Sequence, residues 1–78
     1  MDDARPKLRR HLPAQVVSDP NILGGTPVVR GTRVPAETIL AYLRAGYPRR
    51  EIFTDYPTLP PDGIDAVIRW DAERQRSK

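Results

Sequence analysis

Two arginines, Arg30 and Arg33, have the types and spacing that most suggest chemistry in this sequence. They lie in the segment GGTPVVRGTRVP, residues 24 to 35. This segment reads as a β-hairpin in which Gly31 and Thr32 form a two-residue type II′ turn, because that turn needs glycine at its first central position. Arg30 then lies opposite Arg33, with both side chains on one face. Like charges in that arrangement repel by roughly 0.2 to 1 kcal/mol, so we expect this face to bind an anion, either phosphate or a partner's carboxylate.

The same hairpin has an apolar face and a second interpretation. Val29 and Val34 pair on the side opposite the arginines, which suits packing against a core. The arginine pair could instead form structural salt bridges within the domain, since such networks are common in small proteins. The acidic residues available for such bridges are Asp19, Glu37 and Asp55.

Other arginines fall near predicted helix ends. Arg49 and Arg50 occupy the first turn of a second helix, where positive charge opposes the helix dipole at a cost of ~0.3 to 1 kcal/mol each. A phosphate at that end would relieve the cost, although a solvated surface pair would tolerate it. Near the end of the third helix the candidates for contact with DNA or a partner protein are Arg69, Arg74 and Arg76.

The start of the third helix is acidic. Asp62 and Asp65 flank Gly63 where a helix-turn-helix protein would contact base edges. Carboxylates repel phosphate but complement the helix dipole, so this end is poorly suited to ordinary docking in the major groove. Trp70 and Tyr42 are the candidates for a protein interface, either with the partner or with a second copy, and Trp70 could equally belong to the core.

The elements that would position these residues are a small β element and three short helices. A strand is predicted in 15–19. Proline at position 35 suits the first residue of a helix, and Gly46 suits a left-handed terminator. The predicted ranges are 15–34 for the β element and 35–45, 48–55 and 61–75 for the helices. This outline is mostly α and predicts a tri-helical helix-turn-helix bundle.

Apolar spacing predicts which side chains form the core. Trp70 and Tyr42 fall outside this set. The predicted core residues are Ile39, Leu40, Leu43, Ile52, Phe53, Ile64, Val67, Ile68 and, at the margin, Ala72.

Length and composition favour one soluble domain, residues 15–76, after a basic flexible tail of residues 1–14. The chain has 78 residues, no cysteine and a formal charge of +3. A core this small is marginal, so we expect a homodimer. We expect no membrane span, no signal peptide and a cytoplasmic location. The charge is compatible with nucleic acid or an acidic partner.

A longer pattern carries a family resemblance. GTPVVRGTRVP is followed about twenty residues later by DYPTL. This combination resembles the small prokaryotic family catalogued as domain of unknown function 433, over about two thirds of the chain. The matching residues are Gly25, Pro27, Val28, Arg30, Gly31, Thr32, Arg33, Gly46, Glu51, Ile52, Asp55, Tyr56, Pro57, Leu59 and Ile64. The sequence departs from the family pattern at two helix starts, where Pro48 and Pro60 replace Ser or Thr caps.

The resemblance implies a homeodomain-like three-helix fold with an N-terminal β element. It also implies a VapB-type antitoxin, paired with a PIN-like ribonuclease toxin and binding its own operator DNA. Two alternatives remain: a stand-alone DNA-binding transcriptional regulator, and a dimerisation or adaptor module that does not bind DNA.

Catalysis finds little support in the sequence. The single histidine, His11, lies in the tail, and there is no cysteine for a metal site. No phosphate-binding loop of the Walker type is present. We therefore expect no enzyme activity, no catalytic residue, no metal, no cofactor and no small-molecule substrate.

Overall fold

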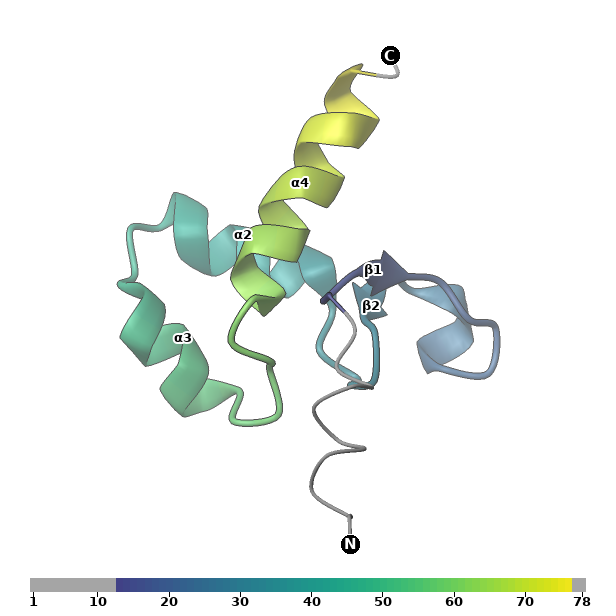
Figure 1. The fold of residues 1–78 in the computed structure, drawn as a ribbon, viewed down its shortest axis with the longest axis horizontal. Coiled ribbons are helices and arrows are strands. Elements are labelled where there is room, and N and C mark those ends of the chain that lie inside the picture. The colour runs from purple at the N-terminus through teal and green to yellow at the C-terminus, as the bar shows by residue number, and fades with distance from the viewer. Residues whose placement is uncertain (1–12, 77–78) are drawn as a thin grey trace, which may run out of the picture.

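The computed structural model describes residues 13–76 (Figure 1). Most of the predicted basic tail, including His11, lies outside the described residues. Pro13 and Ala14 were assigned to that tail, and this was wrong, because the side chain of Ala14 is buried in the core. The backbone N–H of Ala14 donates to the Asp62 carboxylate at 2.9 Å, which fixes the chain at this point.

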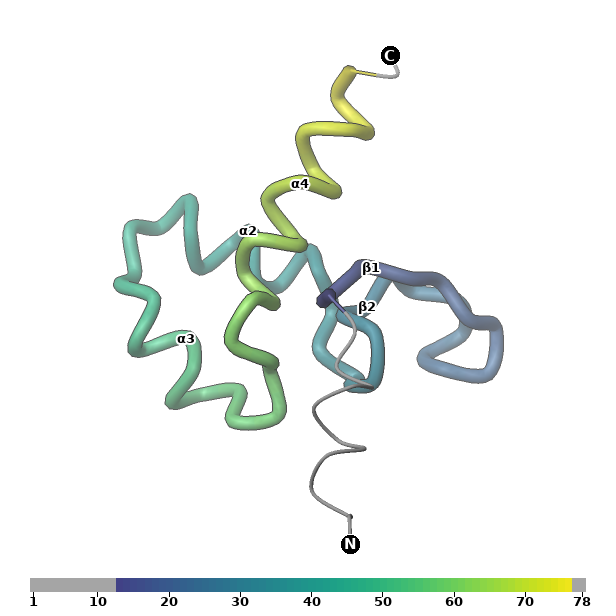
Figure 2. The backbone as a smooth tube through the Cα atoms, viewed as in Figure 1, coloured from purple at the N-terminus to yellow at the C-terminus, as the bar shows by residue number. Residues whose placement is uncertain are grey.

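Three helices follow a small β element, as predicted. The elements in order are β1 (Val16–Val17), the 3₁₀ turn η1 (Leu23–Gly25), β2 (Val28–Val29), α2 (Ala36–Arg44), α3 (Arg49–Asp55) and α4 (Gly63–Arg76). Each helix begins and ends within two residues of its predicted range. Figure 2 traces the path: α2 and α3 lie on one side, β1 and β2 on the other, and α4 stands between them. None of the helices described is long and apolar enough to cross a membrane.

The sheet pairs β1 with β2 in antiparallel register, Val16 with Val29 and Val17 with Val28. On the other side of β2, Val28 also forms a single antiparallel bridge with Pro35. The strand expected in 15–19 is therefore present, and its partner is β2.

The predicted turn of the hairpin was displaced by one residue. The N–H of Thr32 donates to the carbonyl of Val29 at 3.0 Å, so the central residues are Arg30 and Gly31. Gly31 has φ +81°, which is the value for the third residue of a type II turn. The Thr32 hydroxyl closes the loop, donating to the Val29 carbonyl at 2.7 Å and accepting from the N–H of Val34 at 2.9 Å.

Gly46 ends α2 in the left-handed conformation, as predicted. Gly46 has φ +86°, and its N–H donates to the carbonyl of Leu43. The N–H of Tyr47 donates to the carbonyl of Tyr42, which completes a Schellman motif. The rings of Tyr42 and Tyr47 lie 5.0 Å apart, giving the apolar contact that often accompanies this motif.

The helix starts carry no side-chain caps where proline precedes them. Pro35 and Pro48 each occupy the N-cap position, and neither makes a side-chain capping bond. Pro35 was predicted to be the first residue of α2, and that was wrong. It occupies the N-cap position, and the helix begins at Ala36. The start of α4 lies at Gly63, beyond Pro60.

The core lies where α2, α3, α4 and the sheet meet. Ile39, Ile52, Ile64 and Val67 are fully buried, and Leu43, Phe53 and Trp70 pack against the core while partly exposed. Val29 and Val34 are both buried, as the hairpin analysis predicted.

One predicted core position on α4 was wrong. The side chain of Ile68 is 42% exposed, and Ala72 is exposed as well. The buried face follows Gly63, Ala66 and Val67 instead. Two of these are small residues, which let α4 approach both α2 and the sheet but add little to an apolar periodicity.

Candidate functional site

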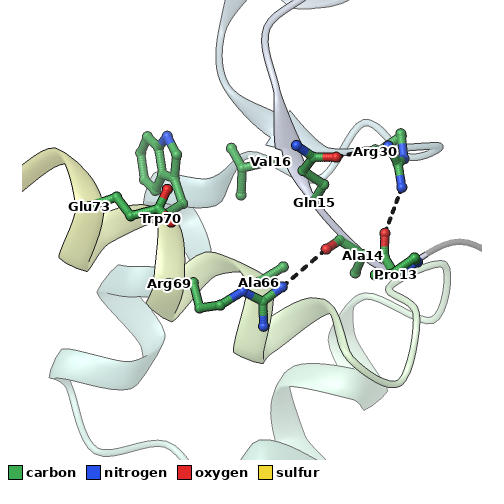
Figure 3. Close-up of a pocket in the computed structure, with 9 residues that line it drawn as sticks. All are labelled: Pro13, Ala14, Gln15, Val16, Arg30, Ala66, Arg69, Trp70 and Glu73. Atoms are coloured by element: carbon green, nitrogen blue, oxygen red, sulfur yellow. Dashed lines mark hydrogen bonds between the residues drawn. The ribbon is translucent and has the colours of Figure 1, made fainter.

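A pocket of about 260 Å³ lies between the segment that leads into β1 and one face of α4 (Figure 3). The segment contributes Pro13, Ala14, Gln15 and Val16, and the turn after β2 adds Arg30. The residues from α4 are Ala66, Arg69, Trp70 and Glu73. Figure 3 places Trp70 and Glu73 on one side, Arg30 with Gln15 on the other, and Arg69 below.

Two arginines in this pocket hold the segment before β1. Arg30 donates to the side-chain oxygen of Gln15 at 2.9 Å and to the carbonyl of Pro13 at 2.6 Å. Arg69 donates to the carbonyl of Ala14 at 3.3 Å. All three acceptors are neutral oxygens, so these bonds leave the positive charge of both guanidinium groups without a counter-charge.

The structure separates the two hairpin arginines. Arg30 reaches back over β1, whereas Arg33 lines a different hollow beside Ile22 and Thr58. The predicted paired face is therefore wrong, because the turn occupies Arg30 and Gly31 and never places the arginines on opposite strands.

The acceptors that might have formed salt bridges with those arginines have other partners. Glu37 pairs with Arg74 at 2.7 Å. Asp55 accepts from the Tyr42 hydroxyl at 2.9 Å, and Asp19 accepts from the N–H of Asn21. Neither hairpin arginine pairs with a carboxylate in residues 13–76.

Three arginines on the helices do pair with carboxylates. Arg49 contacts Asp65 at 3.2 Å, which links the start of α3 to the first turn of α4. Arg44 contacts Asp71 at 3.6 Å. Arg74 contacts both Asp71 and Glu37, and its bond to Glu37 raises the pKa of the guanidinium.

Arg33, Arg50 and Arg76 are exposed, and the described part of the chain gives them no ion pair. Together with Arg30 and Arg69 they make five arginines whose charge is not neutralised by a described carboxylate. We call these five the uncompensated arginines.

The first turn of α4 is covered by the chain itself. Asp62 accepts from the backbone of Ala14, and Gly63 and Ile64 are buried. The sequence indicated that this end was acidic, but it gave no sign that Ala14 would pack on it. Two contacts could not be predicted from the sequence, that of Asp62 with Ala14 and that of Gln15 with Arg30. In each of them the two residues lie far apart along the chain.

The two interface candidates differ in environment. Trp70 is half-buried, and the Arg74 guanidinium stacks over its ring at 4.1 Å. Tyr42 packs between Tyr47 and Tyr56, and its hydrogen bond to Asp55 connects α2 to α3. That bond raises the pKa of Tyr42 to about 12. One edge of Trp70 thus lines the pocket, whereas Tyr42 connects α2 to α3.

Within residues 13–76 no group of three or more His, Cys, Asp or Glu side chains is placed to hold a metal ion. The arrangement offers cationic hydrogen-bond donors and one tryptophan face. These groups suit binding of an anionic partner.

The fold defines a small three-helix domain with an N-terminal β element. The family described as "Protein of unknown function (DUF433)" matches residues 16–70, so the chain belongs to that family. The crystal structure of a DUF433 member protein from Anabaena variabilis ATCC 29413 is similar, with a TM-score of 0.67, 26% identity, and coverage of 95% of this chain and 70% of that one.

A curated relative is the uncharacterized protein y4eO of Sinorhizobium fredii (strain NBRC 101917 / NGR234). It is 47% identical over 49 residues. The match covers 63% of this chain and 22% of that protein, so the chain spans about a fifth of the relative's length.

Proposed function

We propose that this protein is the antitoxin of a type II toxin–antitoxin pair and that it binds and neutralises a PIN-like ribonuclease. The association of such proteins with PIN-like toxins motivates the role. The observation that carries it is the set of uncompensated arginines, since a nuclease centre built from acidic metal ligands is a complementary surface.

Arg33 is the arginine best suited to enter such a centre. It is exposed on a turn and has no described ion pair, so its guanidinium is free to form a two-pronged bond with a carboxylate. A cation among the metal ligands would compete electrostatically with the metal. Arg30 is less suited, because its donors already hold Gln15 and Pro13.

The start of α4 favours a protein partner over a stand-alone DNA-binding regulator. A recognition helix contacts base edges through its first residues. Here Asp62 is bonded to Ala14, and Asp65 is paired with Arg49. This end is a poor surface for the major groove, because the chain's own backbone contacts it at Asp62 and its exposed residue, Asp65, is acidic.

Operator binding remains part of the proposal, through phosphates. Arg50 lies in the first turn of α3 and Arg33 on the turn after β2, both exposed. Contacts of this kind carry little sequence information, and their affinity falls steeply with salt. Measurement of DNA affinity against salt concentration tests this part, and no binding at low salt would favour the adaptor interpretation.

Co-expression with the product of the adjacent gene tests the main proposal. We expect a stable complex by affinity purification and size-exclusion chromatography, and inhibition of its ribonuclease activity. Size-exclusion chromatography of the free protein also tests the expected homodimer. Absence of a complex, or a neighbour that is not a nuclease, would overturn the antitoxin role.

Arg33→Ala tests the assigned arginine. We expect inhibition to weaken roughly tenfold or more, since a charged contact buried at an interface is lost. Arg44→Ala is the matched control, because that exposed arginine already pairs with Asp71. If both variants inhibit equally well, Arg33 has no part in neutralisation although the complex itself would stand.

A further inference from the structure

The outer edge of β1 offers hydrogen-bonding groups next to the pocket. The N–H of Arg30 donates to the carbonyl of Gln15 at 2.7 Å, so Gln15 faces β2. In an antiparallel pair the direction of the backbone groups alternates along the strand, so the N–H and C=O of Val16 point away from β2. The described sheet has two strands, which makes this side of β1 an edge.

Side chains of α4 and the residue before it already occupy the preceding position on that edge. The N–H of Ala14 donates to Asp62, and its carbonyl accepts from Arg69. These two side chains take the place of a neighbouring strand at Ala14. One step further along, Val16 presents the same pair of backbone groups beside Trp70 (Figure 3).

The charge of the pocket indicates what would bind along this edge. Arg30 and Arg69 bond only to neutral oxygens among the described residues and lie on the same pocket. Trp70 adds the ring edge that lines the pocket, which can contact an apolar side chain. Glu73 lies beside Trp70, one helical turn from Arg69, and Arg30 lies across the pocket, so the two arginines outnumber the one carboxylate in its lining (Figure 3).

We propose that an extended acidic segment of the partner protein docks between β1 and α4, its backbone pairing with Val16 and a carboxylate reaching Arg69. This inference rests on the proposed function, because it names the surface on which the protein partner is held. Addition of a strand to a sheet edge is a common mode of peptide recognition. The edge offers one residue for pairing, so the charge and Trp70 supply the specificity.

Two other occupants have the wrong charge. The chain's own N-terminal segment, residues 1–12, carries four basic side chains against two acidic ones, so the pocket arginines would repel its net positive charge. A second copy docking by the same surface would bring two arginines and one glutamate against an identical, net cationic pocket. An acidic partner segment is therefore the occupant that matches the charge of the pocket.

Titration of the ¹⁵N-labelled protein with the peptide acetyl-Glu-Val-Asp-Val-Glu-amide tests the site directly. We expect chemical-shift changes concentrated at the Val16 amide and the Trp70 indole N–H. A peptide with lysine in place of the acidic residues should cause none. Small shifts spread over all arginines would mean non-specific attraction and would overturn the site.

Arg69→Glu should weaken peptide binding roughly tenfold or more, because it reverses the charge in the pocket. The matched control is Arg76→Glu, which makes the same charge change on the same helix at an exposed position outside the pocket. Equal weakening by both variants would show that net charge alone matters. Arg69→Gln keeps the polar side chain and separates charge from any loss of the Ala14 contact.

Amide hydrogen exchange in the complex with the adjacent gene product separates the two proposals. Slowed exchange at Val16 supports both. A complex in which exchange at Val16 is unchanged would overturn the docking site and leave the antitoxin role intact. Peptide binding at Val16 without any complex would overturn the antitoxin role and leave the acidic-segment site intact.

Discussion

The two ends of α4 are held by different interactions. At its start, Gly63 and Ile64 are buried, and Asp62 just before them is bonded to the backbone of Ala14. At its end, the last turns rise away from the body (Figure 1), and Arg74 pairs with Glu37 of α2 and with Asp71 on the same helix. One end is fixed by apolar packing and the other by exposed charges.

The difference bears on function. A helix that recognises DNA bases by its first turn needs that turn exposed. In this protein one face of that turn, Gly63 and Ile64, belongs to the core, its exposed face carries the acidic Asp65, and the uncompensated arginines lie elsewhere. The part of α4 that remains available is its middle, where Arg69 and Trp70 face the pocket.

The largest expected effect comes from Ile64→Ala at the buried end. Removal of a fully buried isoleucine side chain costs about 2 to 5 kcal/mol. Total stability of a domain this size is roughly 3 to 10 kcal/mol, so the variant should be largely or partly unfolded. Urea denaturation followed by circular dichroism measures the loss.

Ile68→Ala is the control for that prediction. Ile68 lies one turn further along the same helix and is 42% exposed. We expect a loss well below that of Ile64→Ala. Equal losses would mean that α4 buries a different face from the one described.

A smaller effect is expected from Gly63→Ala. A Cβ at this position would lie 2.6 Å from Cδ1 of Leu59, which is itself buried. Overpacking of this kind costs about 1 to 3 kcal/mol. A double-mutant cycle with Leu59→Ala tests the cause: the cost of Gly63→Ala should shrink when Leu59 is shortened.

At the exposed end, Arg74→Ala should have a smaller effect still. It removes two surface ion pairs and the stacking on Trp70. We expect the melting temperature to fall by only a few degrees at low salt and by less at high salt, because exposed charges are screened. A loss as large as that of Gly63→Ala would show that charge, and not packing, holds this end.

The Tyr42–Asp55 bond gives a pH-dependent contact away from α4. The pKa of Tyr42 is raised from 10.0 to about 12, so folding favours the protonated phenol. Its contribution to stability is present below pH 10 and is lost as the pH rises from 10 to about 12.

Absorbance titration of the three tyrosines should therefore resolve one late phenol, absent in Tyr42→Phe. At neutral pH no titration effect is expected. If Tyr42→Phe left the absorbance titration unchanged above pH 10, the bond to Asp55 would not hold Tyr42 in solution.

The sequence by itself determined the features that depend on local chemistry. Gly46 ends α2 because its left-handed conformation favours glycine, and Val29 and Val34, the apolar pair of the hairpin, are buried in the core. The three helices and the family pattern could likewise be read from apolar spacing and short motifs. These features depend on residues a few positions apart.

Only the tertiary structure decided how distant residues meet. Arg30 turns toward Gln15 and Pro13 because β1 lies beside β2, and this separates it from Arg33. The buried face of α4 includes Gly63 and Ala66 because two different layers pack against it, so Ile68 is left outside. Pairing across many residues depends on loop geometry and shape, which periodicity along the chain does not record.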